Sequence, residues 1–145
     1  DWRLAASPDG EQMIAFAARM LALRRRFAHF RRTAWLAGAP TARGVKDVLW
    51  LNRQGAEMVE RQWQEWGRYA FGFILGGERP SEPDLLVLLN GEAGDWTMPL
   101  PEGRWRCLLD TVQTDGVPSS EAPISGEIEM PGRTLCIFQS VSDSA

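Results

Sequence analysis

The chain has 145 residues and a formal net charge of −3, and 44% of its residues are hydrophobic while 24% are charged. A chain of this length can form one domain that buries roughly 68 to 70% of the surface that its unfolded form exposes, and the composition is ordinary for a soluble globular protein. No apolar run reaches the ~20 residues of a membrane-spanning helix, and no charged-then-apolar leader opens the sequence. We therefore expect a cytoplasmic protein without membrane contact.

Cysteine and histidine usage restricts the chemistry that the chain can support. Cys107 and Cys136 lie in apolar, strand-like stretches without C-x-x-C spacing, which predicts buried reduced thiols, with a disulfide between neighbouring strands as the alternative. His29 is the only histidine, so metal sites built from clustered histidines are excluded. We expect no metal and no other cofactor. The chain begins with Asp1 rather than Met, so we expect it to be an excised piece of a longer protein.

The first predicted element is a long amphipathic helix, from about residue 8 to about residue 27. Ser7 supplies a capping hydroxyl, Pro8 suits the first helical position, and acids follow in the first turn. Apolar residues recur at spacings of three and four and cover roughly half of the helix circumference; they are Met13, Ile14, Phe16, Ala17, Met20, Leu21, Leu23 and Phe27. One sheet edge can hardly cover so wide a face. We interpret the helix as the last helix of a (β/α)8 barrel whose other parts are missing.

Arginines cluster at the end of this helix, in the run RRRFAHFRR of residues 24–32. The rest of the chain is net acidic and Phe27 and Phe30 fall at core spacing, so we expect no nucleic-acid binding. Arg24 projects close to the apolar face and needs a partner, for which we expect Asp1 or a group in the missing barrel. We expect His29 to be solvated.

After residue 40 the pattern changes to short apolar runs bounded by glycine, proline and polar turns. The predicted strands cover residues 48–51, 69–75, 85–89, 95–100, 104–109, 127–130 and 134–139. The run 85–89 is apolar without alternation, as in a central strand, and it forms a hairpin candidate with 95–100. Trp105, Cys107 and Leu109 are expected to share one face. These features predict a mainly β fold, an antiparallel β-sandwich with Greek-key connections.

The block DVLWLNRQGAEM and the Trp-containing segment after it resemble one known family. Bacterial glycogen debranching enzymes, isoamylase-type members of the α-amylase superfamily, carry a D-x-x-W-x-x-x-x-G-x-E-M block at the start of their C-terminal β domain. The matching residues are Asp47, Trp50, Gly55, Glu57, Met58 and Trp63. LLVLLNGEAGDWTMPLP, WRCLLDT and PGRTLCIF resemble later blocks of the same family in the same order.

The resemblance implies two parts, the end of a catalytic barrel domain in residues 1–40 and a C-terminal β-sandwich domain in residues 41–145. It also implies that the carboxylates that hydrolyse α-1,6-glucosidic branches of glycogen lie upstream, so this chain would be non-catalytic and would stabilise the barrel. Asp47, Glu57, Asp84 and Asp110 are the tempting substitutes. Asp47, Asp84 and Asp110 read as turn or capping acids. In the family the arginine-rich stretch reads R-R-x-H-P-x-F-R-R, and Phe27-Ala28 stands where His-Pro would be.

The seven tryptophans raise the question of sugar binding, because an exposed indole can stack on the apolar face of a glucose ring. Trp50, Trp63 and Trp105 have apolar surroundings and are expected in the core. Trp66, in the polar WQEWGR stretch, and Trp96, beside a turn, are the substrate-binding candidates. The alternative function is therefore an autonomous carbohydrate-binding β-sandwich module, and glycogen or a maltooligosaccharide is the expected partner beside the upstream barrel. An unrelated protein-interaction sandwich is a third possibility.

Overall fold

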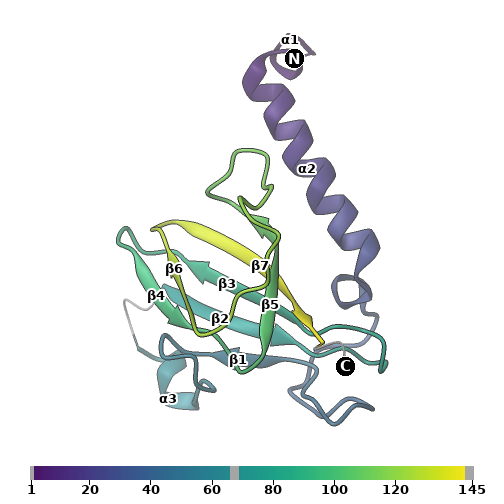
Figure 1. The fold of residues 1–145 in the computed structure, drawn as a ribbon, viewed down its shortest axis with the longest axis vertical. Helices are drawn as coiled ribbons and strands as arrows, with labels where there is room; N and C mark the ends of the chain where they lie inside the picture. The colour runs from purple at the N-terminus through teal and green to yellow at the C-terminus, as the bar shows by residue number, and fades with distance from the viewer. Residues whose placement is uncertain (1, 66–68, 143–145) are drawn as a thin grey trace.

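The computed structural model describes residues 2–65 and 69–142 (Figure 1). In chain order its elements are α1 (Trp2–Ala5), α2 (Pro8–Arg26), the 3-10 helix η1 (Ala28–Arg31), β1 (Leu49–Leu51), α3 (Glu60–Trp63), β2 (Ala70–Leu75), β3 (Leu85–Asn90), β4 (Trp96–Pro99), β5 (Arg104–Asp110), β6 (Glu127–Met130) and β7 (Thr134–Val141). The prediction of a mainly β fold after one long helix is confirmed. Within the described ranges, no helix is long and apolar enough to cross a membrane.

Helix α2 begins where its capping residues predict. The Ser7 side chain accepts a hydrogen bond from the Gly10 amide at 3.2 Å, and Pro8 occupies the first turn. Three arginines occupy the last turn, where positive charge is favourable beside the free carbonyls of a helix end. The helix ends at Arg26, and the residue after it, Phe27, adopts an extended backbone conformation and is buried.

The strands form two antiparallel sheets. Five strands pair in the order β1-β2-β3-β7-β5, and β4 pairs with β6 in a separate two-stranded sheet. Strand β3 lies between β2 and β7 and is buried along most of its length, which confirms the central strand expected from its unbroken apolar run. Whether the connections amount to a Greek key stays a prediction.

The hairpin predicted between residues 85–89 and 95–100 is wrong. Strand β3 pairs with β2 and β7, while β4 crosses to the other sheet and pairs with β6. The alternation of Trp96 and Met98 with polar neighbours is the reason, because both side chains point into the space between the sheets and are at most 3% exposed. The one-sided apolar pattern therefore belongs to a strand that covers the five-stranded sheet, and not to a strand that pairs with β3.

Strand β5 also departs from its predicted alternation. Its register with β7 shifts between Cys107 and Leu109, so two residues of β5 oppose one of β7. As a result Trp105 belongs to the core between the two sheets, whereas Leu108 and Leu109 both belong to the core on the other side of the five-stranded sheet. The expectation that Trp105 and Leu109 share one face is wrong.

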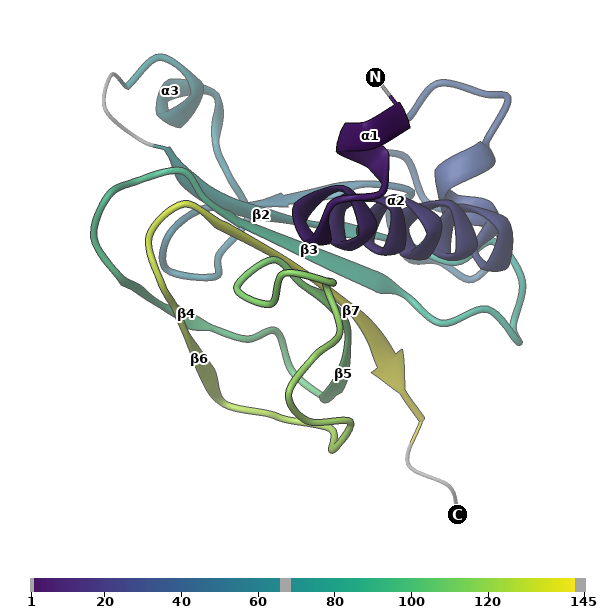
Figure 2. The same cartoon turned by 90° about the horizontal axis from the view of Figure 1, so that it is seen from above.

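The five-stranded sheet thus has apolar side chains on both faces. One face packs against β4 and β6, and the other face packs against the C-terminal end of α2 (Figure 2). Leu23 of α2 and the C-cap residue Phe27 pack there with Leu75, Leu85 and Ile137, among other strand residues. Both cysteines are free thiols; Cys136 is buried as expected, whereas Cys107 is only partly buried.

Candidate functional site, an open apolar helix face and its polar anchor

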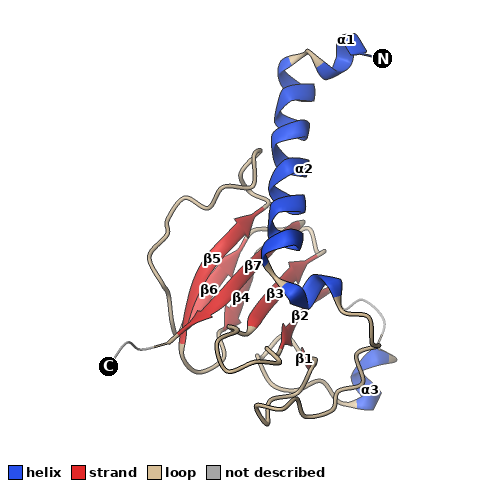
Figure 3. Ribbon diagram, turned by 90° about the vertical axis from the view of Figure 1, so that its right-hand side faces the viewer, coloured by secondary structure: helices blue, strands red, loops and turns tan. Residues whose placement is uncertain are grey.

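Helix α2 is longer than the sheet that it covers. Its N-terminal half projects beyond the ends of the strands (Figure 3). Of its apolar residues, Leu23 is 7% exposed, but Met13 is 66%, Ile14 is 56% and Leu21 is 57% exposed. This confirms that the sheet cannot cover the whole apolar stripe of the helix.

We call the uncovered residues Met13, Ile14, Ala17, Met20 and Leu21 the open face of α2. Consecutive members lie one or three residues apart, so they form one continuous strip on the helix. A hollow of about 270 Å³ at its C-terminal end is lined by Met20, Leu21, Phe30 and other mainly apolar residues. The open face is extended by two further exposed side chains at the N-terminus, Trp2 and Leu4. Continuous exposed apolar surface of this kind marks an interaction site.

Arg24 borders the open face, and its partner differs from the expected one. The guanidinium Nη1 donates to the carbonyl of Phe30, at the end of η1, and the Arg31 side chain donates to the Arg24 carbonyl at 2.9 Å. Arg24 therefore does not need Asp1 or a group outside this chain. The turn after α2 brings a free carbonyl within reach, which the sequence pattern alone does not show.

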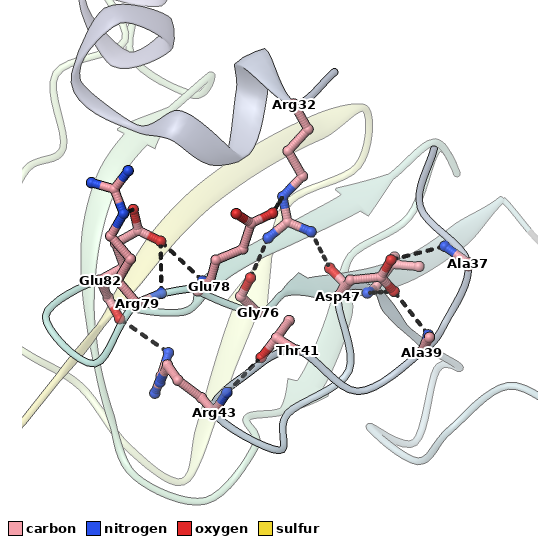
Figure 4. Close-up of polar contacts among 12 residues, drawn as sticks. Arg32, Ala37, Ala39, Thr41, Arg43, Asp47, Gly76, Glu78, Arg79 and Glu82 are labelled. Carbon is pink, nitrogen blue, oxygen red and sulfur yellow. Dashed lines mark hydrogen bonds and ion pairs between the residues drawn. The ribbon is translucent and has the colours of Figure 1, made fainter. Parts of the chain in front are cut away.

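A group of polar contacts, which we call the linker anchor, fixes the segment after η1 to the sheet (Figure 4). Arg32 donates to the carbonyls of Asp47 and Gly76 and lies 3.6 Å from a Glu78 carboxylate oxygen. A side chain at Gly76 would meet the Lys46 carbonyl at 2.3 Å, so only glycine allows these segments to approach so closely.

The linker anchor has a second arginine and two carboxylates. Arg43 lies 2.7 Å from an oxygen of Asp84, which also accepts the Gly77 amide. Asp47 accepts the amides of Ala37, Ala39 and Val48, at 2.9, 3.1 and 2.7 Å.

The hydrogen bond from Ala37, followed by those from nearby amides, holds the pKa of the Asp47 carboxyl below its ordinary value, although partial burial opposes this. The anchor therefore holds the chain between the helix and β1 in one conformation.

The remaining acids that we considered as catalytic substitutes also contact loop or surface groups. Asp110 accepts the Val112 amide at 2.9 Å, as a turn acid does. Asp47 and Asp84 instead accept amides seven or more residues earlier in the chain, so they tie separate segments together. Glu57 lies 2.5 Å from the Lys46 ammonium, and both side chains are about half exposed. Among the described residues, no three His, Cys, Asp or Glu side chains are grouped so that they could hold a metal ion.

His29 is buried, and the prediction that it is solvated is wrong. It is 6% exposed, and neither ring nitrogen makes a hydrogen bond of normal geometry within the described part of the chain. Burial, and then the positive charge of Arg32, lower the pKa of the imidazole, although Glu82 and Asp84 act in the opposite direction. His29 therefore projects from η1 as a neutral ring toward the loop that precedes β3.

This burial predicts an acid-sensitive contribution to stability. Because the folded state disfavours the charged ring, the unfolded state binds the proton more tightly, and the contribution of His29 is fully present above the unfolded pKa of about 6.5. It is lost as the pH falls through that value toward the folded pKa.

Urea denaturation of the native chain and of His29→Phe, each measured at pH 7.5, 6.0 and 5.0, checks this. As the pH falls, the native chain should lose unfolding free energy relative to His29→Phe. A difference between the two proteins that stays constant with pH would contradict the assignment.

Two tryptophans, Trp96 and Trp63, do not lie where the sequence suggests. Trp96 is 3% exposed and its indole nitrogen donates to the Arg53 carbonyl at 3.2 Å, so the expectation that Trp96 lies on the surface is wrong. Its ring faces the interior because β4 covers the five-stranded sheet. Trp66 lies outside the described residues. Trp63, which we expected in the core, is 49% exposed, and its ring meets the Trp50 ring edge-on with centroids 5.2 Å apart.

A small hollow of about 100 Å³ adjoins Trp63. Its lining includes Asn52, Arg53, Gln62 and Phe71, so polar groups and an aromatic ring surround one concavity. Trp63 falls inside the polar stretch RQWQEW, and this polarity indicates an exposed side chain. The apolar residues upstream of this stretch indicated a core position instead. Trp105 is buried as expected. Trp35 is 97% exposed, and the sequence pattern did not identify it as a surface residue.

The comparisons with known proteins identify the relatives of this chain. No family model matches it. It is 31% identical over 139 residues to a glycogen debranching enzyme of Klebsiella pneumoniae, and 25% identical over 155 residues to a glycogen operon protein GlgX homolog of Mycobacterium bovis. Each similarity covers 96% of this chain but only 18% and 21% of the respective relative, so the chain spans about a fifth of their length.

Solved structures agree on the fold. A pullulanase from Bacillus acidopullulyticus superposes with a TM-score of 0.65 over 97% of this chain and 15% of its own, at 17% identity. A second pullulanase, from Anoxybacillus sp. LM18-11 and complexed with maltotetraose, gives a TM-score of 0.63. The chain is thus related, over nearly its whole length, to one segment of the glycogen debranching enzymes. This confirms the resemblance of its ordered sequence blocks and is consistent with the C-terminal region of an isoamylase-type enzyme.

Proposed function

We propose that this chain is the non-catalytic C-terminal domain, with the final barrel helix attached, of a cytoplasmic enzyme that hydrolyses α-1,6-glucosidic branches in glycogen or limit dextrin. Its role is to pack against the upstream catalytic barrel of the same polypeptide and to stabilise it. The relatives named above support the enzyme class. The open face of α2 is the observation that carries the role, because it offers the barrel an apolar surface that the sheet leaves uncovered.

The geometry of the two parts supports this division. The linker anchor fixes the segment between α2 and β1, and Leu23 and Phe27 fix the end of α2 on the sheet. A partner that docks on the projecting half of α2 is thereby held in one orientation relative to the β domain. Residues 1–40 as the end of the barrel and residues 41–145 as the β domain are part of the same proposal.

The acids in this chain support placing the chemistry elsewhere. Hydrolysis with retention needs two carboxyl groups about 5 to 5.5 Å apart across the scissile bond. Asp47 and Asp84 are occupied by backbone amides, and Asp84 also by Arg43. Glu57 is paired with Lys46 on the surface.

Assaying the isolated chain tests the proposal. The chain is expressed in a host without its own debranching enzyme and incubated with limit dextrin, and the release of short maltooligosaccharides is measured. We expect no turnover above the empty-vector control, because the reactive carboxylates lie upstream. Turnover that co-purifies with the chain would overturn the non-catalytic role.

An autonomous carbohydrate-binding module is the second candidate, and Trp63 is the observation that favours it. A half-exposed indole beside Arg53 and Gln62 has the combination of an apolar face and polar groups that sugar binding uses. Calorimetric titration with maltooligosaccharides separates the two roles. Binding that Trp63→Ala weakens about tenfold, equivalent to about 1.4 kcal/mol, while Trp35→Ala leaves it unchanged, would support the module. No detectable heat would contradict it.

A further inference from the structure

A third hollow, on the opposite flank of α2 from the open face, is lined by arginines. It has a volume of about 250 Å³ and lies where α2, β5, β7 and the loop after β5 meet. Figures 1 and 2 show this loop beside the middle of α2. The residues that matter here are Arg19, Arg26, Arg106, Glu121 and Gln139, and we call the site the arginine hollow.

The register of the sheet brings two of these arginines together. Arg106 on β5 lies directly opposite Gln139 on β7, so their side chains emerge side by side on the helix-covered face. Gln139 in turn accepts a hydrogen bond from Arg26 of α2 at 3.4 Å. Gln139 thus neighbours two arginines that come from different elements. Arg26 is also held over the Phe27 ring, with 4.9 Å from its guanidinium carbon to the ring centroid.

The third arginine approaches from two turns earlier on α2. Arg19 donates to the Leu108 carbonyl at 3.4 Å, which is a long hydrogen bond. This bond uses one of the five N–H donors of the guanidinium group. The Nε of Arg106 is buried and has no hydrogen-bond partner within the described residues. Native proteins rarely leave a buried donor of a charged group unpaired, because its lost hydration costs free energy. The site therefore lacks an acceptor.

Charge points to the nature of that acceptor. Three guanidinium groups line the arginine hollow against one carboxylate, Glu121, whose residue is exposed. Across residues 2–65 and 69–142, none of Arg19, Arg26 and Arg106 takes part in an ion pair. Since the whole chain is net negative, this local positive charge is not part of a general basic surface.

We propose that the arginine hollow binds a small phosphate-bearing anion. Guanidinium groups present planar pairs of N–H donors that match phosphate oxygens, and a dianion would offset the charge of these three clustered arginines. The volume favours a group of this size, because pockets for larger organic ligands measure roughly 300 to 1,000 Å³. The ligand is either free phosphate or the phosphate of a small phosphorylated sugar. This inference does not depend on the proposed function.

Calorimetric titration of the chain at pH 7.5 and low salt tests the site, with inorganic phosphate in one arm and glucose 6-phosphate in the other. We expect binding in at least one arm, weakened about tenfold or more in Arg19→Gln and in Arg106→Met because each loses a charge-assisted hydrogen bond. Binding of the sugar phosphate alone would support the proposal and identify the sugar as part of the recognised group. The absence of heat in both arms would overturn it.

Arg25→Gln is the matched control, since Arg25 is exposed on the same helix and does not line the arginine hollow. It should bind like the native chain, and an equal loss in this variant would contradict a defined site. Arg106→Met guards against a folding artefact, because methionine removes the unpaired donor and keeps the apolar stem. Its thermal midpoint without phosphate should be at least that of the native chain, while the phosphate-dependent rise in the midpoint should disappear.

Discussion

Replacing Asn90 with aspartate should destabilise the fold by about 3 kcal/mol or more. Asn90 is 1% exposed, and its amide nitrogen donates to the carbonyls of Gly94, Met130 and Pro131 at 3.0 to 3.1 Å. Its side-chain oxygen accepts the Glu92 amide at 3.1 Å. One side chain therefore joins the turn after β3 to the turn after β6, and so links the two sheets.

The substitution preserves the shape of the side chain but removes every donor. A carboxylate would point at three carbonyl oxygens inside the protein, without water to separate them. Urea denaturation at pH 7 measures the loss, and Gln54→Glu, the same chemical change at an exposed site, should alter stability by less than about 0.5 kcal/mol. The deficit of Asn90→Asp should shrink as the pH falls, since a protonated carboxyl can donate one hydrogen bond again. Stability within about 0.5 kcal/mol of the native chain would show that this network is not needed.

The block order of the second half was a strong guide to the elements but not to their pairing. Apolar runs at regular spacing located the seven strands found in residues 2–65 and 69–142, and the unbroken run at 85–89 placed β3 in the centre of its sheet. The prediction of strand pairing was wrong for β4, which could belong to either sheet. Trp96 and Met98 fit either a neighbour of β3 or a covering layer, and only the assembled sheets decide between them.

Side-chain burial was predicted best where an element has one clear face. Leu23 of α2 and the C-cap residue Phe27 are buried as the helical spacing suggests, and the remainder of the stripe is exposed because the sheet is too short. His29 could not be predicted, since its burial depends on the loop that holds Glu82 and Asp84, far away in sequence. The arginine hollow was likewise invisible, because its arginines come from α2 and from β5 and meet only through the register with β7.

The second large effect concerns the open face of α2, and its size depends on the length of the polypeptide. Leu21 is 57% exposed in this chain, so Leu21→Gln should change the unfolding free energy of the isolated chain by less than about 0.5 kcal/mol. In the longer polypeptide that we propose, the upstream barrel covers Leu21. The same substitution should then cost about 1.5 to 3 kcal/mol, the value of a fully buried leucine side chain, plus the cost of burying an amide.

Chemical denaturation of both lengths of polypeptide, native and Leu21→Gln, is the measurement that tests this account most directly. A matched variant, Glu129→Gln on β6, changes an exposed side chain of the sheet farther from α2 and should have little effect at either length. We expect a small loss in the isolated chain and a loss several times larger in the long form for Leu21→Gln. Equal small losses at both lengths would mean that nothing docks on the open face, and the proposed role as a support for the barrel would be wrong.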